Sequence, residues 1–362
     1  MKATGIIVEY NPFHNGHAYH INKARELTEC DILIACCSGD FNQRGDLSII
    51  NKYQKTIAAL DHGVDLVVEL PFICTVQNAY VFGRKAVDIL KQLKIENLVF
   101  GSETNNLDEL RKYAEMEIDV TRLKELMHDG SSYPEAYGLL SGSLYPNDIL
   151  AVCYLKALKN TKIKPISIKR TNDYHSEDMA VIASASAIRK AVREKKDFSL
   201  SSDIKISEPV FNDDLYPYLR TLLFTASKQD LRQIFLVDEG IESLLKKNAL
   251  ANDNYEDFLN SCISRRYTRS RIQRILIMIA CQIKKEEIRN LPANDYVRVL
   301  GFNAKGREYL RQLKEENSFI TLFKNLPEPY KDIEWRSSLL YASLLKDPDA
   351  YIKRVLQGPV IK

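Results

Sequence analysis

The first half of the chain alternates between short apolar runs and longer segments whose apolar residues stand three or four positions apart. Short apolar runs bounded by turn-forming residues are typical of buried strands, and the wider spacing is typical of amphipathic helices. The runs predict strands at residues 4–10, 31–37, 64–70, 97–100 and 162–169, with helices at 14–28, 52–61, 79–93 and 148–159. Strands that alternate with helices over short connections predict a parallel sheet. The expected fold class is α/β, beginning with a Rossmann-like domain.

The pattern changes twice later in the chain. Residues 106–129 are charged and helical in spacing, which predicts an insertion or lid beside the first domain. A charged, serine-rich stretch at 195–208 predicts a linker, and beyond it the strand signals fade while helical patterns dominate from residue 215 to 356. The sequence therefore predicts two domains, 1–195 and 196–362, of which the second is mostly helical.

Composition narrows the class of protein without deciding it. With 45% hydrophobic and 27% charged residues, the chain is typical of globular proteins, and its net charge of +3 is too small to indicate nucleic acid by itself. Its seven cysteines are scattered without a C-x-x-C pair, as expected of thiols in a reducing compartment. No apolar stretch is long enough for a membrane span, and the first apolar run is too short for a signal peptide. We therefore expect a cytoplasmic protein with no membrane contact.

Candidate chemistry begins directly after the first predicted strand. Residues 11–13 break that strand, and His14-Asn15-Gly16-His17 opens the next helix. The first turn of a helix attracts phosphate through its free N–H groups and its dipole, and Gly16 leaves room for a nucleotide. The alternatives are a pair of capping histidines or an incomplete metal site. Because no Cys, Asp or Glu stands at ligand spacing beside His14, His17 and His20, no metal centre is expected.

Several polar residues follow later predicted strands. Gln43 and Arg44 lie in the loop after the second strand, where they could face the same site, although a loop arginine is often simply solvated. Asn147 either caps the helix that follows it or touches a ligand.

An arginine-rich segment stands out in the second half. It reads Arg265-Arg266-Tyr267-Thr268-Arg269-Ser270-Arg271-Ile272-Gln273-Arg274. One interpretation is a solvated helix face. The other is RNA binding, because cations at a helix start oppose the dipole unless an anion offsets them, and arginine with an aromatic ring suits RNA. We expect RNA binding, since the segment has few acidic neighbours in the sequence.

The stretch from Val8 to His17, Val-Glu-Tyr-Asn-Pro-Phe-His-Asn-Gly-His, resembles the opening of the tRNA(Met) cytidine acetate ligases, a family within the HxGH nucleotidyltransferase superfamily. Residues 184–190 resemble the superfamily's second signature, a serine-rich helix start that holds phosphates, although Ala183 and Ala185 depart from it. The segment Gly301-Phe302-Asn303-Ala304-Lys305-Gly306-Arg307 also resembles the ligases. The resemblance covers nearly the whole chain.

The resemblance implies an ATP-dependent ligase. Such enzymes form acetyl-adenylate from acetate and ATP, release pyrophosphate, and acetylate N4 of the wobble cytidine of elongator tRNA(Met). ATP is then a substrate, and no obligate protein partner is evident. Mg²⁺ would accompany the ATP phosphates, and the nearest carboxylates that could assist it are Glu9 and Asp40. Alternatives are a small-molecule adenylyltransferase or acid–amine ligase of the same superfamily, and a non-catalytic RNA-binding protein that senses ATP.

The resemblance and the arginine segment together give three sets of candidate residues. The catalytic set is His14, His17 and Arg189. The ATP-binding set is Ile7, Val8, Glu9, Tyr10, Asn11, Pro12, Phe13, His14, Asn15, Gly16, His17, His20, Gly101, Asn147, Arg170, Ser186 and Arg189. The tRNA-binding set is Arg265, Arg266, Tyr267, Arg269, Arg271 and Arg274.

Overall fold

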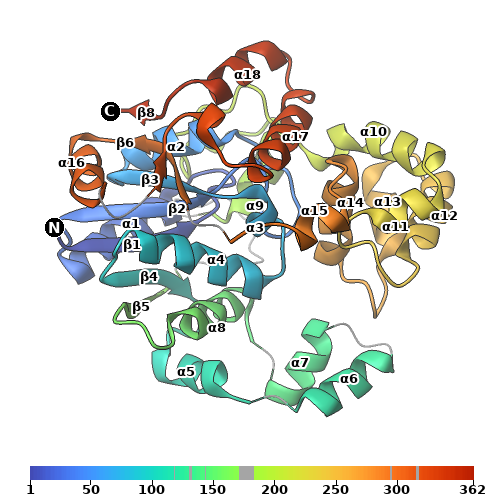
Figure 1. Cartoon of the computed structure of the whole chain (residues 1–362), viewed down its shortest axis with the longest axis horizontal. Coiled ribbons are helices and arrows are strands. Elements are labelled where there is room, and N and C mark those ends of the chain that lie inside the picture. The colour runs from blue at the N-terminus through green and yellow to red at the C-terminus, as the bar shows by residue number, and fades with distance from the viewer. Residues whose placement is uncertain (118, 130–132, 143, 171–182, 294–295, 315–317) are drawn as a thin grey trace.

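The computed structural model describes the chain except for residues 118, 130–132, 143, 171–182, 294–295 and 315–317 (Figure 1). In this part of the chain one sheet has the strand order β5-β4-β1-β2-β3-β6-β7, and β8 pairs with β6. The strands are β1 (Ala3–Val8), β2 (Ile32–Ser38), β3 (Leu66–Leu70), β4 (Asn97–Ser102), β5 (Lys164–Lys169), β6 (Tyr296–Phe302), β7 (Ser318–Ile320) and β8 (Val360–Ile361). Strands β1 to β5 are mutually parallel. The predicted α/β class and parallel sheet are confirmed.

Helices surround the sheet and form a separate group beside it. The first half contains α1 (Asn15–Thr28), α2 (Lys52–Asp61), α3 (Phe72–Thr75), α4 (Ala79–Gln92), α5 (Leu107–Glu115), α6 (Val120–His128), α7 (Tyr133–Ser141), α8 (Pro146–Leu158) and α9 (Ala185–Arg193). The second half contains α10 (Asn212–Thr225), α11 (Lys228–Gln233), α12 (Ile241–Ala251), α13 (Tyr255–Cys262), α14 (Arg269–Ala280), α15 (Lys285–Arg289), α16 (Ala304–Leu313), the 3₁₀ turn η1 (Phe323–Asn325), α17 (Tyr330–Ala342) and α18 (Pro348–Leu356).

Local signals explain why the helices of the first half begin and end near the predicted residues. Asn51 caps α2 by accepting from two backbone N–H groups, and Asn78 caps α4 in the same way. The predicted end of α2 is confirmed, because His62 is its C-cap and Gly63 follows with φ +98°. Strands β2 and β3 are buried along their whole length, as expected for parallel strands covered on both faces.

The second half is only partly as predicted. Helices α10 to α15 form a helical region to one side of the sheet (Figure 1). The chain then returns: β6 pairs antiparallel with β3, and α17 packs against α3. The second half is mostly helical, as predicted, but β6, β7 and β8 have no recognisable signal in the sequence. Strand β6 has the sequence Tyr-Val-Arg-Val-Leu-Gly-Phe, and it is not recognised as a buried strand because Arg298 interrupts its apolar run.

Arg298 is tolerated in the core because it belongs to a buried ionic network. Its guanidinium lies 2.6 Å from Glu69 of β3, and Lys52 lies 3.0 Å from Glu69 and 3.4 Å from Asp40. The hydroxyl of Tyr351 in α18 donates to Asp40 at 2.5 Å. Buried charges are stable only when paired and hydrogen-bonded, so this network ties the C-terminal segment to the first sheet strands.

Two further features of the fold concern the edge strands of the sheet and the character of the helices. Strand β5 forms one edge and carries Lys164, Pro165 and Lys169, while the short β7 lies at the other. None of the helices in the described part combines the length and apolar character that a bilayer span needs.

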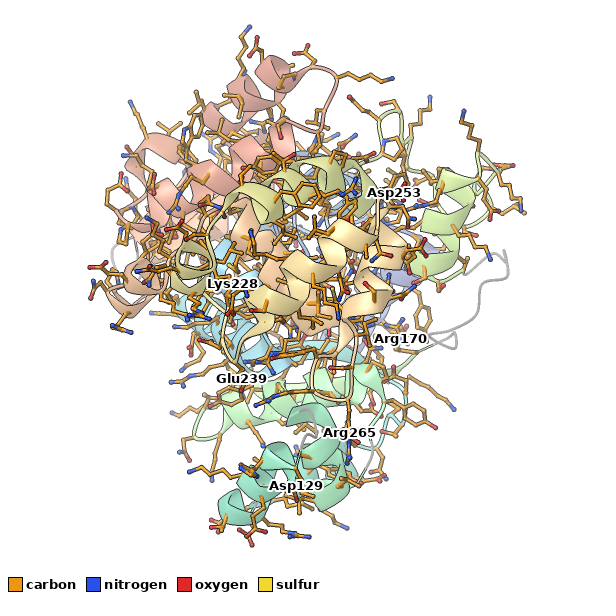
Figure 2. The ribbon with its side chains drawn as sticks, turned by 90° about the vertical axis from the view of Figure 1, so that its right-hand side faces the viewer. Asp129, Arg170, Lys228, Glu239, Asp253 and Arg265 are labelled. Atoms are coloured by element: carbon orange, nitrogen blue, oxygen red, sulfur yellow. The ribbon has the colours of Figure 1, made fainter. Side chains whose placement is uncertain are left out.

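The described residues of the predicted insertion form α5, which lies below α8 in Figure 1, and α6, which lies with α7 below the helical region. Helix α5 packs on α8, and α6 packs on α7. Arg265 reaches across to it, with its Nε donating to Glu135 Oε1 of α7 at 3.3 Å. Figure 2 shows Arg265 between the insertion, marked by Asp129, and the helical region, marked by Glu239.

Candidate active site

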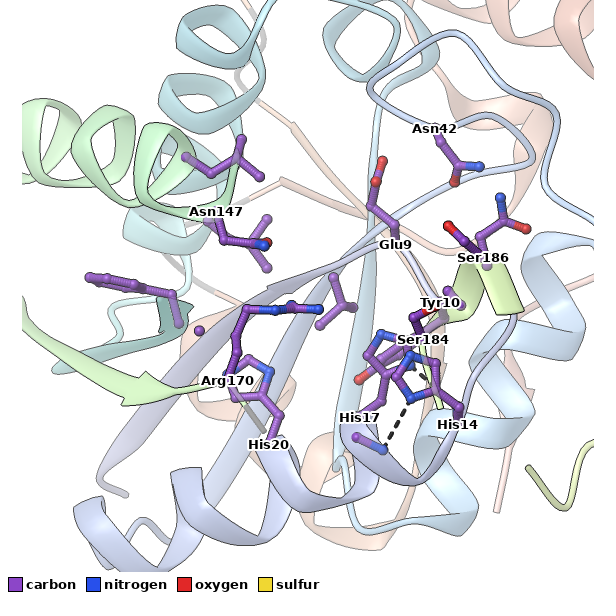
Figure 3. Close-up of a pocket in the computed structure, with 18 of the residues that line it drawn as sticks. Glu9, Tyr10, His14, His17, His20, Asn42, Asn147, Arg170, Ser184 and Ser186 are labelled. Atoms are coloured by element: carbon purple, nitrogen blue, oxygen red, sulfur yellow. Dashed lines mark hydrogen bonds between the residues drawn. The ribbon is translucent and has the colours of Figure 1, made fainter. Parts of the chain in front are cut away.

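A cavity of about 400 Å³ opens at the carboxyl ends of β1, β4 and β5 (Figure 3). The chain runs outward from β1 through β2 to β3 and then returns to place β4 on the other side of β1. Ligands of open parallel sheets bind at such a reversal of strand order. Residues from the end of β1, the start of α1, the loop after β2, the ends of β4 and β5, and the start of α9 line the cavity.

The two histidines of the HxGH motif form the floor of the cavity next to α1. His14 is the N-cap residue of α1, and its Nδ1 accepts from the N–H of Gly16 at 3.0 Å. The Nδ1 of His17 accepts from the N–H of His14 at 3.2 Å, and the two rings lie 3.8 Å apart. In a neutral imidazole only one nitrogen carries a proton, so both rings keep theirs on Nε2. The two histidines do cap α1, as one interpretation proposed. The same hydrogen bonds hold each ring so that its Nε2–H remains a donor.

Burial and nearby cations keep these rings neutral. Burial, with Arg170 and Arg189 adding to it, lowers the pKa of His14 to about 4. Burial, followed by His14 and Arg170, holds the pKa of His17 well below its usual range. The pKa of His20 is also lowered to about 4 by burial, although its Nε2 lies 3.3 Å from the carbonyl of Val99. An anion bound here would meet neutral donors and the positive end of α1.

The second predicted phosphate-binding segment meets the first. Ser184 caps α9, and the guanidinium of Arg189 donates to Ser186 Oγ at 3.0 Å and to the carbonyl of Asn11 at 2.8 Å. Ser184, Ser186 and Arg189 all line the cavity. The starts of α1 and α9 therefore converge on one space.

Gly101, Asn147 and Arg170 line the opposite part of the cavity. A Cβ at Gly101 would lie 3.3 Å from Cγ of Arg170, so the backbone and this side chain pack closely. Tyr145, not Asn147, is the N-cap residue of α8, so the capping prediction for Asn147 is wrong. Its side-chain amide instead donates to Glu103 at 2.6 Å, which holds it at the cavity wall.

The loop after β2 supplies residues that the sequence singled out only in part. Arg44 lines the cavity, but the side chain of Gln43 donates to the carbonyl of Gln77 and does not. The N–H of Gln43 instead holds the carboxylate of Glu9, at 2.6 Å. Asn42 and Asp46 line the cavity without having been predicted, because nothing in a short polar loop shows which side chains turn inward.

Buried polar atoms indicate that the cavity suits a polar ligand. Tyr10 Oη and Asn42 Oδ1 are buried, with no hydrogen-bond partner in the described part of the chain. Buried polar atoms usually have partners, so the exceptions favour a ligand that supplies them.

Three residues of the predicted ATP-binding run do not line the cavity: Pro12, Phe13 and Asn15. Phe13 packs beneath His17 with ring centroids 5.6 Å apart, and its carbonyl accepts from Ser202 Oγ. The backbone N–H of Asn15 donates to the carbonyl of Ser201. These three side chains are therefore not placed to contact a nucleotide in the cavity. Phe13 and Asn15 instead connect the HxGH loop to Ser201 and Ser202.

Asp40, expected as a magnesium neighbour, lies outside the lining and is buried between Lys52 and Tyr351. No group of three or more His, Cys, Asp or Glu side chains among the described residues is placed to hold a metal ion. Glu9 and Asp46 are the carboxylates that line the cavity.

The arginine-rich segment differs from its prediction in two respects, the first of which concerns charge. Its arginines have acidic partners: Arg265 pairs with Glu135, Arg266 and Arg271 with Glu239, and Arg269 with Glu256. The expectation of few acidic partners is wrong because the fold brings glutamates from outside the segment against its arginines.

Tyr267 is buried in this segment. Its hydroxyl donates to the carbonyl of Glu239, and Arg271 lies over its ring at 5.1 Å. The ring is therefore not available to stack on a base in this structure.

These features define a class. A parallel sheet with a histidine pair at its strand reversal, and a second helix start that adds serine and arginine, is the arrangement of a nucleotidyltransferase. A family model described as HIGH Nucleotidyl Transferase matches residues 1–354.

Comparison with known proteins places the chain more closely. Proteins named tRNA(Met) cytidine acetate ligase match it from Oceanobacillus iheyensis (35% identity, 100% of both chains), Fusobacterium nucleatum (37%, 100% of this chain and 99% of the other) and Bacillus subtilis (32%, 96% and 94%). A crystal structure of Thermotoga maritima TmcAL superposes with a TM-score of 0.89 at 28% identity, covering 100% of this chain and 99% of that one. A second crystal structure, of the same protein bound with alpha-thio ATP, gives 0.87 with the same identity and coverage. The chain belongs to the tRNA(Met) cytidine acetate ligase family.

Proposed function

We propose that this protein activates acetate with ATP and transfers the acetyl group to N4 of the wobble cytidine of elongator tRNA(Met). The observation that carries the proposal is the neutral histidine pair facing a polar cavity, in a chain that matches the ligases from end to end. The related structure bound with alpha-thio ATP supports ATP as the ligand. The scattered free cysteines suit a cytoplasmic location.

In the first step, an acetate oxygen attacks the α-phosphorus of ATP. Acetyl-adenylate forms, and the bond to the leaving pyrophosphate breaks. The Nε2–H groups of His14 and His17 would donate to the α-phosphate oxygens as negative charge develops there, which is electrostatic rather than covalent catalysis. Arg189, with Ser186 and the N–H groups that start α9, would hold the β- and γ-phosphates.

The rest of the cavity would bind the nucleoside. The backbone from Ile7 to Asn11, together with Gly16 and His20, forms one wall, and Gly101, Asn147 and Arg170 form the other. Mg²⁺ would be carried by the ATP phosphates, where it neutralises charge. Glu9 and Asp46 are the carboxylates close enough to the cavity to assist, and they do not amount to a dedicated metal cage.

In the second step, the exocyclic amine of cytidine attacks the acetyl carbon, the N–C bond forms, the mixed anhydride breaks, and AMP leaves with loss of one proton from the amine. The anhydride is reactive enough that no protein nucleophile is required. The exposed arginines 265, 266 and 269 would bind the RNA backbone by exchanging their glutamate partners for phosphates. Such surface pairs are worth only about 0–1 kcal/mol, so the exchange costs little.

The first experiment measures pyrophosphate release from ATP across small carboxylic acids, with and without bulk tRNA. Release that requires acetate, with acetyl transfer to tRNA, supports the proposal. Acid-dependent release without any transfer to RNA would favour a small-molecule adenylyltransferase or acid–amine ligase. ATP binding without acid-dependent release would favour an ATP-sensing RNA-binding protein.

Replacing His17 by Ala tests the mechanism. Loss of an Nε2–H donor to the transition state is expected to lower acetyl-adenylate formation by about 100- to 1,000-fold, while tRNA affinity stays close to that of the unchanged protein. His128→Ala is the control, because His128 is exposed in the insertion. Unchanged turnover in His17→Ala would contradict the proposed mechanism.

A further inference from the structure

Arg274 differs from the other arginines of its segment. Arg265, Arg266, Arg269 and Arg271 each pair with a glutamate, whereas Arg274 makes no hydrogen bond or ion pair with any residue that the structure describes. Its side chain is half-buried on α14. Burial, and then the like charges of Arg271 and Arg44, lower its pKa to about 10. An arginine that is largely withdrawn from water among other cations costs free energy unless an anion compensates it.

Arg274 stands where the helical region meets the rim of the cavity. A Cβ at Gly45 would lie 2.4 Å from the backbone nitrogen of Arg274, so the loop after β2 rests directly on α14. Asp46 of this loop accepts from Gln273 at 2.5 Å and from Asn212 at 2.9 Å. Both bonds go to Asp46 Oδ1, and Asp46 forms no ion pair with Arg274 in the described structure.

The same loop carries Arg44 into the cavity lining, beside Asn42 and Asp46. Arg44 is close enough to Arg274 to depress its pKa. The loop that carries Arg44 therefore rests on the turn of α14 that carries Arg274, and no acidic side chain of the described structure is ion-paired with Arg274. A guanidinium group can donate two parallel, charge-assisted hydrogen bonds to the oxygens of one phosphate.

We propose that Arg44 and Arg274 form a phosphate-binding subsite that joins the nucleotide cavity to the helical region. The phosphate would come either from the triphosphate tail of ATP, which leaves as pyrophosphate, or from the RNA backbone beside the target cytidine. The inference rests on the proposed function for these two substrates, and it adds a position where the first domain and the helical region hold one ligand together.

The test compares Arg274→Gln with Arg220→Gln in the full chain. Arg220 is a half-buried arginine of α10 that does have a partner, because its Nε donates to the carbonyl of Ala249 at 3.0 Å. For each variant, the melting temperature without ligand and the Kd values for inorganic pyrophosphate and for bulk tRNA are measured.

Arg274→Gln is expected to melt at the same temperature as the unchanged protein or higher, since it removes an uncompensated charge. It should bind at least one of the two probes about tenfold more weakly, which corresponds to about 1.4 kcal/mol. Arg220→Gln should show the opposite pattern, with a lower melting temperature and unchanged Kd values. Weaker binding of pyrophosphate assigns the subsite to the triphosphate tail, and weaker binding of tRNA alone assigns it to RNA.

Two results would overturn the inference: Kd values of Arg274→Gln within twofold of the unchanged protein for both probes, or a melting temperature lowered as in Arg220→Gln. Failure of the proposed function is distinguishable, because the unchanged protein would then show no acetate-dependent pyrophosphate release. The melting temperature does not depend on activity.

Discussion

At the scale of single residues, the neutral histidines of the cavity have a consequence for stability. An ordinary histidine pKa near 6.5 in the unfolded chain falls to about 4 for His14 and His20 in the folded protein. Between these values the unfolded chain binds more protons than the folded one. Their contribution is therefore complete above about pH 6.5 and is lost as the pH falls towards 4.

We expect the free energy of unfolding to fall by roughly 2–3 kcal/mol per buried histidine over that range, as an upper limit. Denaturant unfolding at several pH values checks this. His20→Gln should flatten the dependence, and His128→Gln, at an exposed site, should not. A slope that is identical in all three proteins would show that these rings do not control it.

At the scale of elements, the loop after β2 is the contact between the cavity and the helical region. Gly45 has φ +86° and no room for a Cβ against α14, whereas Gly240 has φ +81° and no atom within 4 Å of the Cβ position. Gly240→Ala should cost about 1 kcal/mol for the backbone conformation alone. Gly45→Ala should cost roughly 3 kcal/mol or more because the clash is added to it, and it should also weaken ATP binding. Equal losses in urea unfolding would show that the loop can move away from α14.

The arginine-rich segment makes a second prediction at this scale. Replacing Arg265, Arg266 and Arg269 by Ala should weaken tRNA binding, and the slope of log Kd against log salt should become flatter by up to about one for each phosphate that the variant no longer binds. Acetate-dependent pyrophosphate release, measured in parallel, reports whether the nucleotide site is intact.

The control for that experiment is a variant with the same change in charge at other faces: Arg84, Arg311 and Lys331 replaced by Ala, each of which has an acidic neighbour on its own helix or just before it. If both triple variants lose tRNA affinity equally, general charge and not this segment controls binding.

Some elements of the fold and the site could be predicted from the sequence, and others could not. The period of the apolar residues located β1 to β5 and their helices, and the strand-loop-helix pattern located His14 and His17, because both depend on neighbours in sequence. The place of β6 could not be found, since the partners that make Arg298 acceptable in a strand, Glu69 and Lys52, are more than two hundred residues away. The glutamates that pair with the arginine-rich segment, and the inward turn of Asn42 and Asp46, are set by tertiary contacts in the same way.

At the scale of the whole molecule, the sheet joins the two ends of the chain. The predicted division at residue 195 separates the segments along the sequence, yet β6 and the network around Glu69 place the last part in the same core as the first. We therefore expect one cooperative unfolding transition.

The single tryptophan, Trp335 in α17, makes this measurable. Its fluorescence belongs to the C-terminal segment, while far-UV circular dichroism reports all helices and strands. The two signals should change at the same denaturant concentration. Separate midpoints would show that residues 196–362 unfold on their own.

Among the described strands, β5 is paired on one side only, which has a consequence for how copies of the protein behave in a crowded solution. An unpaired edge is a template on which another chain can add a strand, and such growth leads to aggregates. In β5 two lysines would place charge against charge in a β5-to-β5 pairing, and Pro165 offers no N–H for a ladder. The sheet can therefore end in solvent there and still resist edge-to-edge growth into insoluble assemblies.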